Sequence, residues 1–205
     1  LAQVNVLVSM FFAGMNGSVV ADTATVGALV LPAMKKAGYP AAFSAAVTGV
    51  SSTIGGIIPP SIMMIVLANA TEISIAALFA AGIIPGILIG VVIMVINHYF
   101  AVKYNFERSD EPFSVRRAGK ELYRSSFALL IPLVLVGSVM GGVASVVEAG
   151  AITALVALFT GVFVYRTIKW NDCTGAFRRA FRNSAMVFII IAASGPFSWL
   201  LTSLG

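Results

Sequence analysis

The residues that could do chemistry lie in two polar interruptions of an otherwise apolar sequence. The first is a glycine-bearing run over residues 14–23, which contains Asn16, Ser18 and Asp22. The second, over residues 53–61, carries two glycines followed by two adjacent prolines. Because proline has no N–H group, helical hydrogen bonds must fail in this second run and leave carbonyl oxygens free. Secondary transporters hold Na⁺ with such carbonyls, and their half-helix N-termini face anionic substrates.

Hydroxyl side chains flank the two prolines and are candidate substrate ligands. Ser61 begins the segment after the prolines, where unpaired N–H groups could meet a substrate carboxylate. Ser51, Ser52 and Thr53 could line the same cavity, or could hydrogen-bond carbonyls one turn back along their own helix. A proline kink without any ligand is the alternative for this run, because membrane helices tolerate such kinks.

Two acidic residues stand in apolar surroundings. Asp22 is the only acid in the first 70 residues, and an acid within a membrane segment is a functional candidate by default. We expect it to cap the second helix of its segment by accepting backbone N–H groups, with direct ion ligation as the alternative. Glu148 follows a glycine break at 141–145 and should lie near a helix N-terminus, where we expect a structural role. The sequence contains no catalytic triad, zinc motif or P-loop, so we predict neither an enzyme nor a transition-metal site.

The elements that position these residues must lie in a membrane. Hydrophobic residues make up 59% of the 205 positions and charged residues only 10%, whereas a soluble domain carries about 25% charged residues. Long apolar stretches separate three basic clusters, at 35–36, 103–124 and 166–182. The net charge of +5 is then a topogenic signal that places these clusters in the cytoplasm, and not evidence of nucleic-acid binding. The sequence therefore predicts an all-α, multi-pass protein of the bacterial inner membrane, surrounded by the lipid bilayer.

Six segments are expected along the chain, and the first two carry the candidate site. Residues 1–36 hold two apolar runs too short to span a bilayer, so we expect a re-entrant helical hairpin, with one kinked spanning helix as the alternative. Residues 37–70 should form a broken transmembrane helix. The other four are a transmembrane helix over 71–103, a cytoplasmic amphipathic arm over 104–124, a helical pair with a glycine break over 125–166, and an amphipathic segment with an incomplete transmembrane helix over 167–205.

Taken together, these motifs resemble the large membrane subunit of the tripartite ATP-independent periplasmic (TRAP) transporters. The order, spacing and hydropathy of the motifs agree along essentially the whole chain. The matching motifs lie at 12–22, 32–39 and 54–61, and more loosely at 78–86 and at Glu148-Ala149 after the glycine break.

The resemblance implies a sodium-driven importer of organic acids, such as C4-dicarboxylates, keto acids or sugar acids. It also implies an elevator-type secondary transporter fold built from two inverted halves, of which this chain covers the first half and the opening of the second. The expected partners are a small membrane subunit and a periplasmic binding protein that delivers the substrate. No cofactor is expected beyond Na⁺ as the coupling ion. We expect the chain to be a fragment that lacks the second hairpin, and with it a second sodium site.

The resemblance further implies where the first sodium site lies. Its ligands would be the side chains of Asn16 and Ser18 and the carbonyls of Gly55, Ile58 and Pro60. Oxygen ligands without a nearby carboxylate suit a monovalent hard cation, because a Ca²⁺ site would need several acids. Two other functions remain open: a divalent-anion/sodium symporter of another elevator family, and a membrane scaffold that transports nothing. A requirement for a binding protein would exclude the first, and intolerance of substitution at the candidate ligands would exclude the second.

Overall fold

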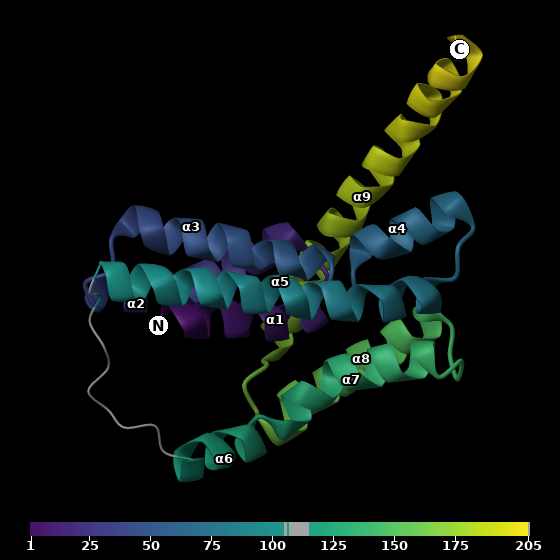
Figure 1. The fold of residues 1–205 in the computed structure, drawn as a ribbon. Helices are drawn as coiled ribbons and strands as arrows, with labels where there is room; N and C mark the ends of the chain where they lie inside the picture. The colour runs from purple at the N-terminus through teal and green to yellow at the C-terminus, as the bar shows by residue number, and fades with distance from the viewer. Residues whose placement is uncertain (105, 107–114, 205) are drawn as a thin grey trace. The chain divides into compact units, whose positions relative to one another are not determined.

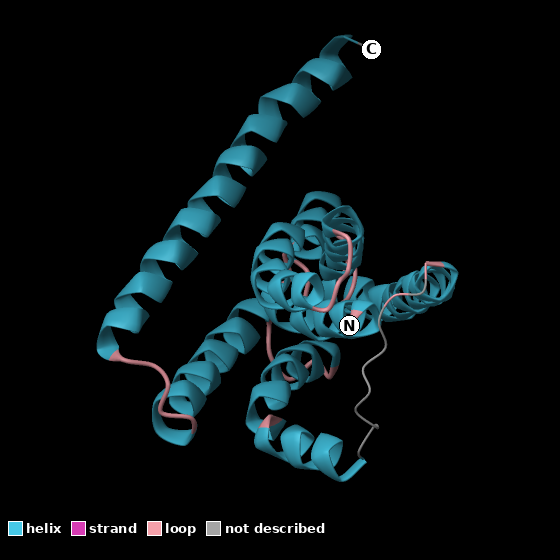
Figure 2. Cartoon of the chain, turned by 90° about the vertical axis from the view of Figure 1, so that its left-hand side faces the viewer, coloured by secondary structure: helices cyan, strands magenta, loops and turns pink. Residues whose placement is uncertain are grey.

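The computed structural model describes residues 1–104, 106 and 115–204, and every regular element in these residues is a helix (Figure 1). Turns and short loops join the helices, as the colouring by secondary structure shows (Figure 2). The all-α prediction is therefore confirmed. The chain divides into two compact units, residues 1–156 and 157–205, and each is described by itself.

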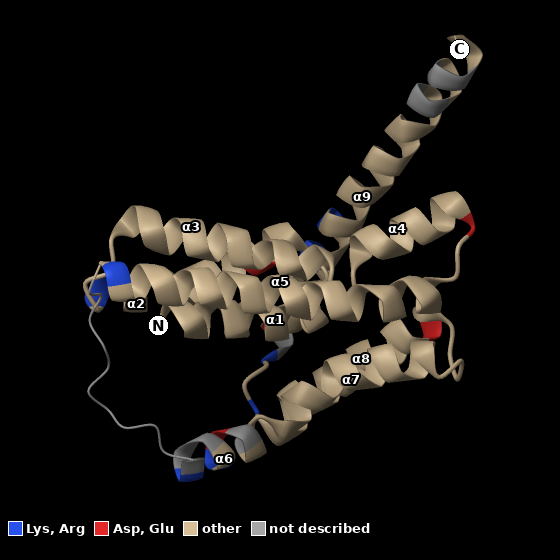
Figure 3. Ribbon diagram, in the orientation of Figure 1, with Lys and Arg blue, Asp and Glu red and all other residues tan. Residues whose placement is uncertain are grey.

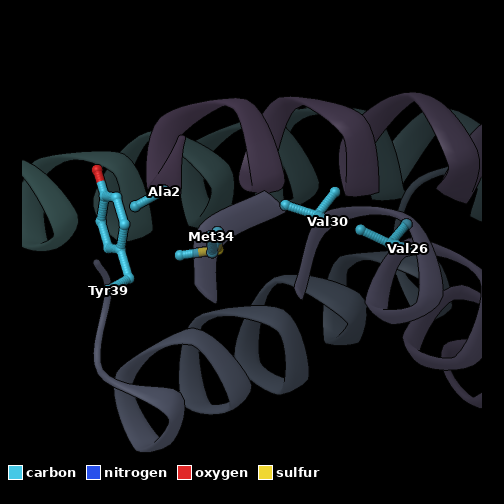
Figure 4. Close-up of a cluster of buried hydrophobic side chains, with 5 residues drawn as sticks. All are labelled: Ala2, Val26, Val30, Met34 and Tyr39. Carbon is cyan, nitrogen blue, oxygen red and sulfur yellow. The ribbon is translucent and has the colours of Figure 1, made fainter. Parts of the chain in front are cut away.

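The first two helices of the first unit form a hairpin. α1 (Ala2–Asn16) and α2 (Val19–Lys36) are joined at Gly17, whose φ of 58° lies in the left-handed region that glycine adopts readily. Ser18 then caps α2, because its hydroxyl accepts a hydrogen bond from the N–H of Ala21 at 3.4 Å. Away from the turn, α1 and α2 share a buried apolar cluster of Ala2, Val26, Val30, Met34 and Tyr39 (Figure 4).

The next helix is interrupted. α3 (Ala41–Ser52) passes into a short 3₁₀ helix, Thr53–Gly56, and α4 (Ile62–Thr71) begins only after the two prolines. Ser61 links the two sides of the interruption by hydrogen bonds. Its hydroxyl donates to the carbonyl of Gly56 at 2.8 Å and accepts from the N–H of Met64 at 3.4 Å. The interruption thus coincides with the glycines and prolines that cannot continue a helix.

α5 (Ile75–Lys103) packs against α1, α3 and the interrupted segment. Its residues Gly82, Gly86 and Gly90 lie one turn apart and therefore on one face of the helix. A Cβ atom built at any of them would lie within about 2.5 Å of an atom of α1 or of the interrupted segment. This face of α5 thus admits a close approach that any larger residue would prevent.

The remainder of the first unit is α6 (Val115–Arg124), α7 (Ser126–Met140) and most of α8 (Val146–Phe159). Residues 107–114 of the expected arm lie outside the described residues. A capping box starts α8: the Glu148 carboxylate accepts from the N–H and the hydroxyl of Ser145, at 2.8 and 2.7 Å, while the Ser145 hydroxyl accepts from the Glu148 N–H. Glu148 therefore stabilises the start of this helix.

In the second unit, α8 passes into a π-helical turn at Thr160–Val164, and α9 (Trp170–Leu204) follows after a loop. Among the described residues, two stretches are long and apolar enough to cross a membrane, namely α5 and Val146–Val164, while α4 and α7 are apolar but shorter.

Apart from those of the charged helix α6, the charged side chains of the first unit gather at helix ends (Figure 3). Lys35 and Lys36 lie in the last turn of α2, Lys103 ends α5, and Glu72 follows α4. Between these ends, α5 exposes many large apolar side chains, a surface that suits lipid and not water. Asp22 is the exception, since it is fully buried inside the unit.

Candidate functional site

The two polar interruptions of the sequence touch each other in the structure. We call residues 14–18 the hairpin turn and residues 53–61 the helix break. The N–H of Ile62, directly after the break, donates to the carbonyl of Gly17 at 3.0 Å. A Cβ built on Gly17 would lie 2.6 Å from the Pro60 carbonyl oxygen, so only glycine permits this approach. One hydrogen bond and one close backbone contact thus join segments 45 positions apart.

The expected sodium ligands border this contact. Among the described residues, no hydrogen bond reaches the carbonyl oxygens of Gly55, Ile58 or Pro60, so their lone pairs are available to a cation. Asn16 is half-buried, and the terminal amide nitrogen assigned to it is enclosed without a hydrogen-bond partner. Because amide nitrogen and oxygen are interchanged by a rotation of the side chain, the same position can present an oxygen.

Ser18 and Gly55 lie on opposite sides of the same contact. A Cβ built on Gly55 would lie 3.6 Å from the Ser18 carbonyl oxygen, so the two backbones are neighbours. The Ser18 hydroxyl caps α2 with one lone pair, and a hydroxyl has a second one to offer. The structure therefore brings Ser18 and Gly55, two of the expected sodium ligands, to the same contact.

The hydroxyl groups expected to line a substrate cavity make local hydrogen bonds in the structure. Ser51 and Ser52 donate to the carbonyl of Thr48 at 3.1 and 2.8 Å, and Thr53 donates to the carbonyl of Val50 at 2.7 Å. Ser51 and Ser52 are buried, whereas Thr53 is exposed. The structure thus shows the bonds to carbonyls one turn back, and a role of these residues in substrate binding stays a prediction.

The start of α4 also differs from expectation. The sequence predicts free N–H groups there for a substrate carboxylate, but the Ile62 N–H is already bonded to Gly17 and the Met64 N–H to the Ser61 hydroxyl. The prediction of a free N–H at Ile62 is wrong, because the hairpin turn occupies the position in front of it. Ser61 itself is fully buried.

Asp22 does not cap α2. Ser18 holds that position, and neither carboxylate oxygen of Asp22 has a hydrogen-bond partner among the described residues. The expected capping role is therefore wrong: Asp22 lies four residues after the cap, and its side chain turns into the packed interior, where it is fully buried.

Sequence reasoning missed two polar residues of α1. The amide nitrogen of Asn5 donates to the hydroxyl of Thr48 at 2.7 Å, and the hydroxyl oxygens of Ser9 and Ser51 lie 3.1 Å apart. Asn5 and Ser9 are four residues apart in an otherwise apolar helix, a spacing that places them on one face. This spacing was the available signal, and the two residues form a buried polar seam between α1 and α3.

An apolar groove of about 290 Å³ lies elsewhere, between α3 and α5. Its walls are apolar apart from Asn97, so it does not suit an organic acid. The lining residues are Phe43, Ala46, Val47, Val50, Ile93, Ile96, Asn97 and Phe100.

Comparison with known proteins gives a match over the entire chain. Residues 1–205 match the family described as tripartite ATP-independent periplasmic transporter, DctM component. The chain is 34% identical over 203 residues to the C4-dicarboxylate TRAP transporter large permease protein DctM of Pseudomonas aeruginosa, a match that covers 99% of the chain and 47% of that protein.

Two further relatives are TRAP transporter large permease proteins named for other substrates. The chain is 31% identical over 201 residues to the sialic acid TRAP transporter large permease protein SiaM of Vibrio cholerae, and 32% identical over 202 residues to the 2,3-diketo-L-gulonate TRAP transporter large permease protein YiaN of Escherichia coli. Each match covers 98% of the chain and 47% of the relative. The chain thus spans about half the length of the curated relatives it matches.

Proposed function

Because the chain belongs to the DctM component family of the tripartite ATP-independent periplasmic transporters, which are membrane permeases and not enzymes, we propose that it forms the ion-handling half of a sodium-coupled organic-acid importer. The observation that carries the proposal is the contact between the hairpin turn and the helix break. It gathers free carbonyls and polar side chains where two helices are interrupted, which is how secondary transporters bind coupling ions.

The sodium site consists of Asn16, Ser18 and the carbonyls of Gly55, Ile58 and Pro60. Backbone carbonyls, an amide and a hydroxyl are hard oxygen ligands, and none carries a charge that would demand a divalent ion. An ion bound between the hairpin turn and the helix break would stabilise their contact. Ion binding and the position of the hairpin are thereby coupled, as a symporter requires.

The substrate is an anionic organic acid. The relatives are named for C4-dicarboxylate, sialic acid and 2,3-diketo-L-gulonate, which all carry at least one carboxylate. A small soluble anion cannot cross a bilayer unaided, and coupling to Na⁺ compensates its charge. Since Ser61 and Ile62 are committed to internal hydrogen bonds, the carboxylate contacts a surface other than the start of α4, and the half of the protein beyond this chain contributes to it.

The transporter works in the inner membrane with a periplasmic binding protein and a small membrane subunit. One relative is named as the isethionate TRAP transporter permease protein DctMQ, and the chain matches 30% of its length.

The test is uptake by the full-length protein in proteoliposomes with its small subunit. Radiolabelled organic acids are supplied with and without the cognate binding protein, under an inward sodium gradient or with equal sodium on both sides. We expect the acid to accumulate above its external concentration only when the sodium gradient and the binding protein are both present. Accumulation above the external concentration with equal sodium on both sides would contradict sodium coupling, and uptake without the binding protein would contradict the tripartite mechanism.

A further inference from the structure

Asp22 is a carboxylate buried without any partner that donates to it. Its exposed fraction is 0%, and neither oxygen has a hydrogen-bond partner in the described part of the chain. The only basic residues in the first 70 positions, Lys35 and Lys36, lie about 20 Å away along α2 at 1.5 Å per residue. An unpaired buried charge is costly, so a buried carboxylate normally has a counter-charge or donors.

The hydroxyls of Ser9 and Ser52 lie beside this carboxylate, but neither makes a hydrogen bond of normal geometry with it. Ser52 donates its single proton to the carbonyl of Thr48 at 2.8 Å. Ser51 donates to the same carbonyl at 3.1 Å. The one assignment that satisfies both contacts of Ser51 has Ser9 donating to the Ser51 oxygen, 3.1 Å away.

All three hydroxyl protons are therefore used elsewhere. What Ser9 and Ser52 present to Asp22 is lone pairs, so the cluster is a set of oxygens facing one another with no positive group between them. The N-terminus of α2, one turn before Asp22, favours the carboxylate as an anion but supplies no donor to it. Oxygens arranged in this way repel each other unless a cation binds among them or a proton neutralises the carboxylate.

We infer that Asp22, Ser9 and Ser52 form a cation site of their own, which takes one monovalent hard cation such as Na⁺. One carboxylate and one monovalent ion give a neutral buried pair, whereas a divalent ion would leave an uncompensated charge inside the bundle. The ligands are all oxygens, as such a cation prefers. The site joins α1, α2 and α3, and it lies next to the helix break, because a Cβ on Gly55 would be 3.6 Å from the Cβ of Asp22.

This inference does not depend on the sodium site at the hairpin turn. The ions bound at these two sites can be counted separately by equilibrium binding of ²²Na⁺ to variants of the purified full-length protein. Asp22→Asn should lower the number of ions bound per molecule by one. The variant should fold, since the new amide N–H groups can donate to the lone pairs of Ser9 and Ser52. Thr23→Ala is the matched control: Thr23 is exposed on the same helix and bonds only to the Val19 carbonyl in the described structure, so the count should not change.

A second variant keeps the carboxylate. Ser52→Ala removes one ligand, while the Ser51 hydroxyl still donates to the Thr48 carbonyl. We therefore expect an unchanged ion count and a roughly 10-fold weaker affinity for Na⁺ at the Asp22 site, equivalent to about 1.4 kcal/mol. The combined variant Asp22→Asn/Asn16→Ala should bind one ion fewer than the wild type, and the ion left at the hairpin turn should bind about 10-fold more weakly. Identical ion counts and affinities in Asp22→Asn and in the combined variant would overturn the inference, because Asp22 would then belong to the site at the hairpin turn.

Two other results are decisive. An unchanged ion count in Asp22→Asn would overturn the inference and show a carboxyl group that is neutralised by a proton. Loss of one ion in Asp22→Asn together with an unchanged sodium affinity in Asn16→Ala would support the Asp22 site and refute Asn16 as a ligand at the hairpin turn.

Discussion

At the scale of residues, the contact between the hairpin turn and the helix break depends on Gly17. Its positive φ turns the chain, and its missing side chain lets the Pro60 carbonyl approach. Gly38 has a similar positive φ of 76°, but a Cβ there would meet nothing within 4 Å. Gly17 and Gly38 thus share a left-handed backbone conformation but differ in what surrounds them.

Gly17→Ala should therefore impair transport far more than Gly38→Ala. Both changes place alanine in the left-handed region, at a cost of about 1–2 kcal/mol each. Only Gly17→Ala also forces the hairpin turn away from the helix break. Sodium-dependent uptake, normalised to the amount of folded protein, measures the difference; equal activities would show that the close approach at Gly17 has no functional role.

Asn16→Ala and Ser18→Ala should each raise the sodium concentration for half-maximal uptake. Losing one ligand to an ion removes an interaction of roughly 1.5–3 kcal/mol, or about 10-fold or more in affinity. Ser18→Ala should also lower the stability of the protein, since it removes the cap of α2. Thermal unfolding without sodium separates the two effects, and an unchanged sodium dependence in both variants would refute the proposed ligands.

At the scale of elements, the helix break is maintained by Pro59 and Pro60. Replacing both by alanine should let one helix continue from α3 into α4, because proline costs about 3 kcal/mol in a helix interior. The carbonyls from Gly55 onward would then be bonded within the helix. We expect normal expression and loss of sodium-dependent uptake; wild-type uptake by the double variant would show that the break is only a kink.

The hairpin of α1 and α2 is expected to enter and leave the membrane on the cytoplasmic side. Cysteines introduced at Gln3 and Lys36, in a full-length background with Cys173 replaced, should both react only with an impermeant thiol reagent supplied from the cytoplasm. Labelling at Gln3 from the periplasm would mean that α1 and α2 cross the membrane together as one kinked span.

The sequence predicts these elements well because their causes are local. The helix break follows from Pro59 and Pro60, and the hairpin turn from the glycines around Asn16. The contacts between elements are different, since they depend on which residues tertiary packing brings together. No local pattern shows that the N–H of Ile62 donates to the carbonyl of Gly17. Nor does one show that Asp22, four residues after the cap of α2, turns its side chain into the interior. The predictions of a free N–H at Ile62 and of a capping role for Asp22 failed for that reason.

At the scale of the whole molecule, the chain spans about half the length of its curated relatives, and we propose that it is the ion-handling half of a transporter. The glycine face of α5, at Gly82, Gly86 and Gly90, holds the interrupted segment and α1 close to one spanning helix. The hairpin, the helix break and α5 therefore pack as one group within the first unit. If this group binds the coupling ion, as we propose, the ion crosses the membrane together with the substrate.

The most direct measurement is the movement of sodium driven by the substrate. Proteoliposomes that contain the full-length protein and its small subunit are given ²²Na⁺ at equal concentration on both sides, together with an inward gradient of the organic acid on its binding protein. The account predicts that ²²Na⁺ accumulates inside in proportion to the acid taken up, and that Pro59→Ala/Pro60→Ala abolishes both movements. Uptake of the acid by the wild-type protein without accumulation of ²²Na⁺ would contradict it.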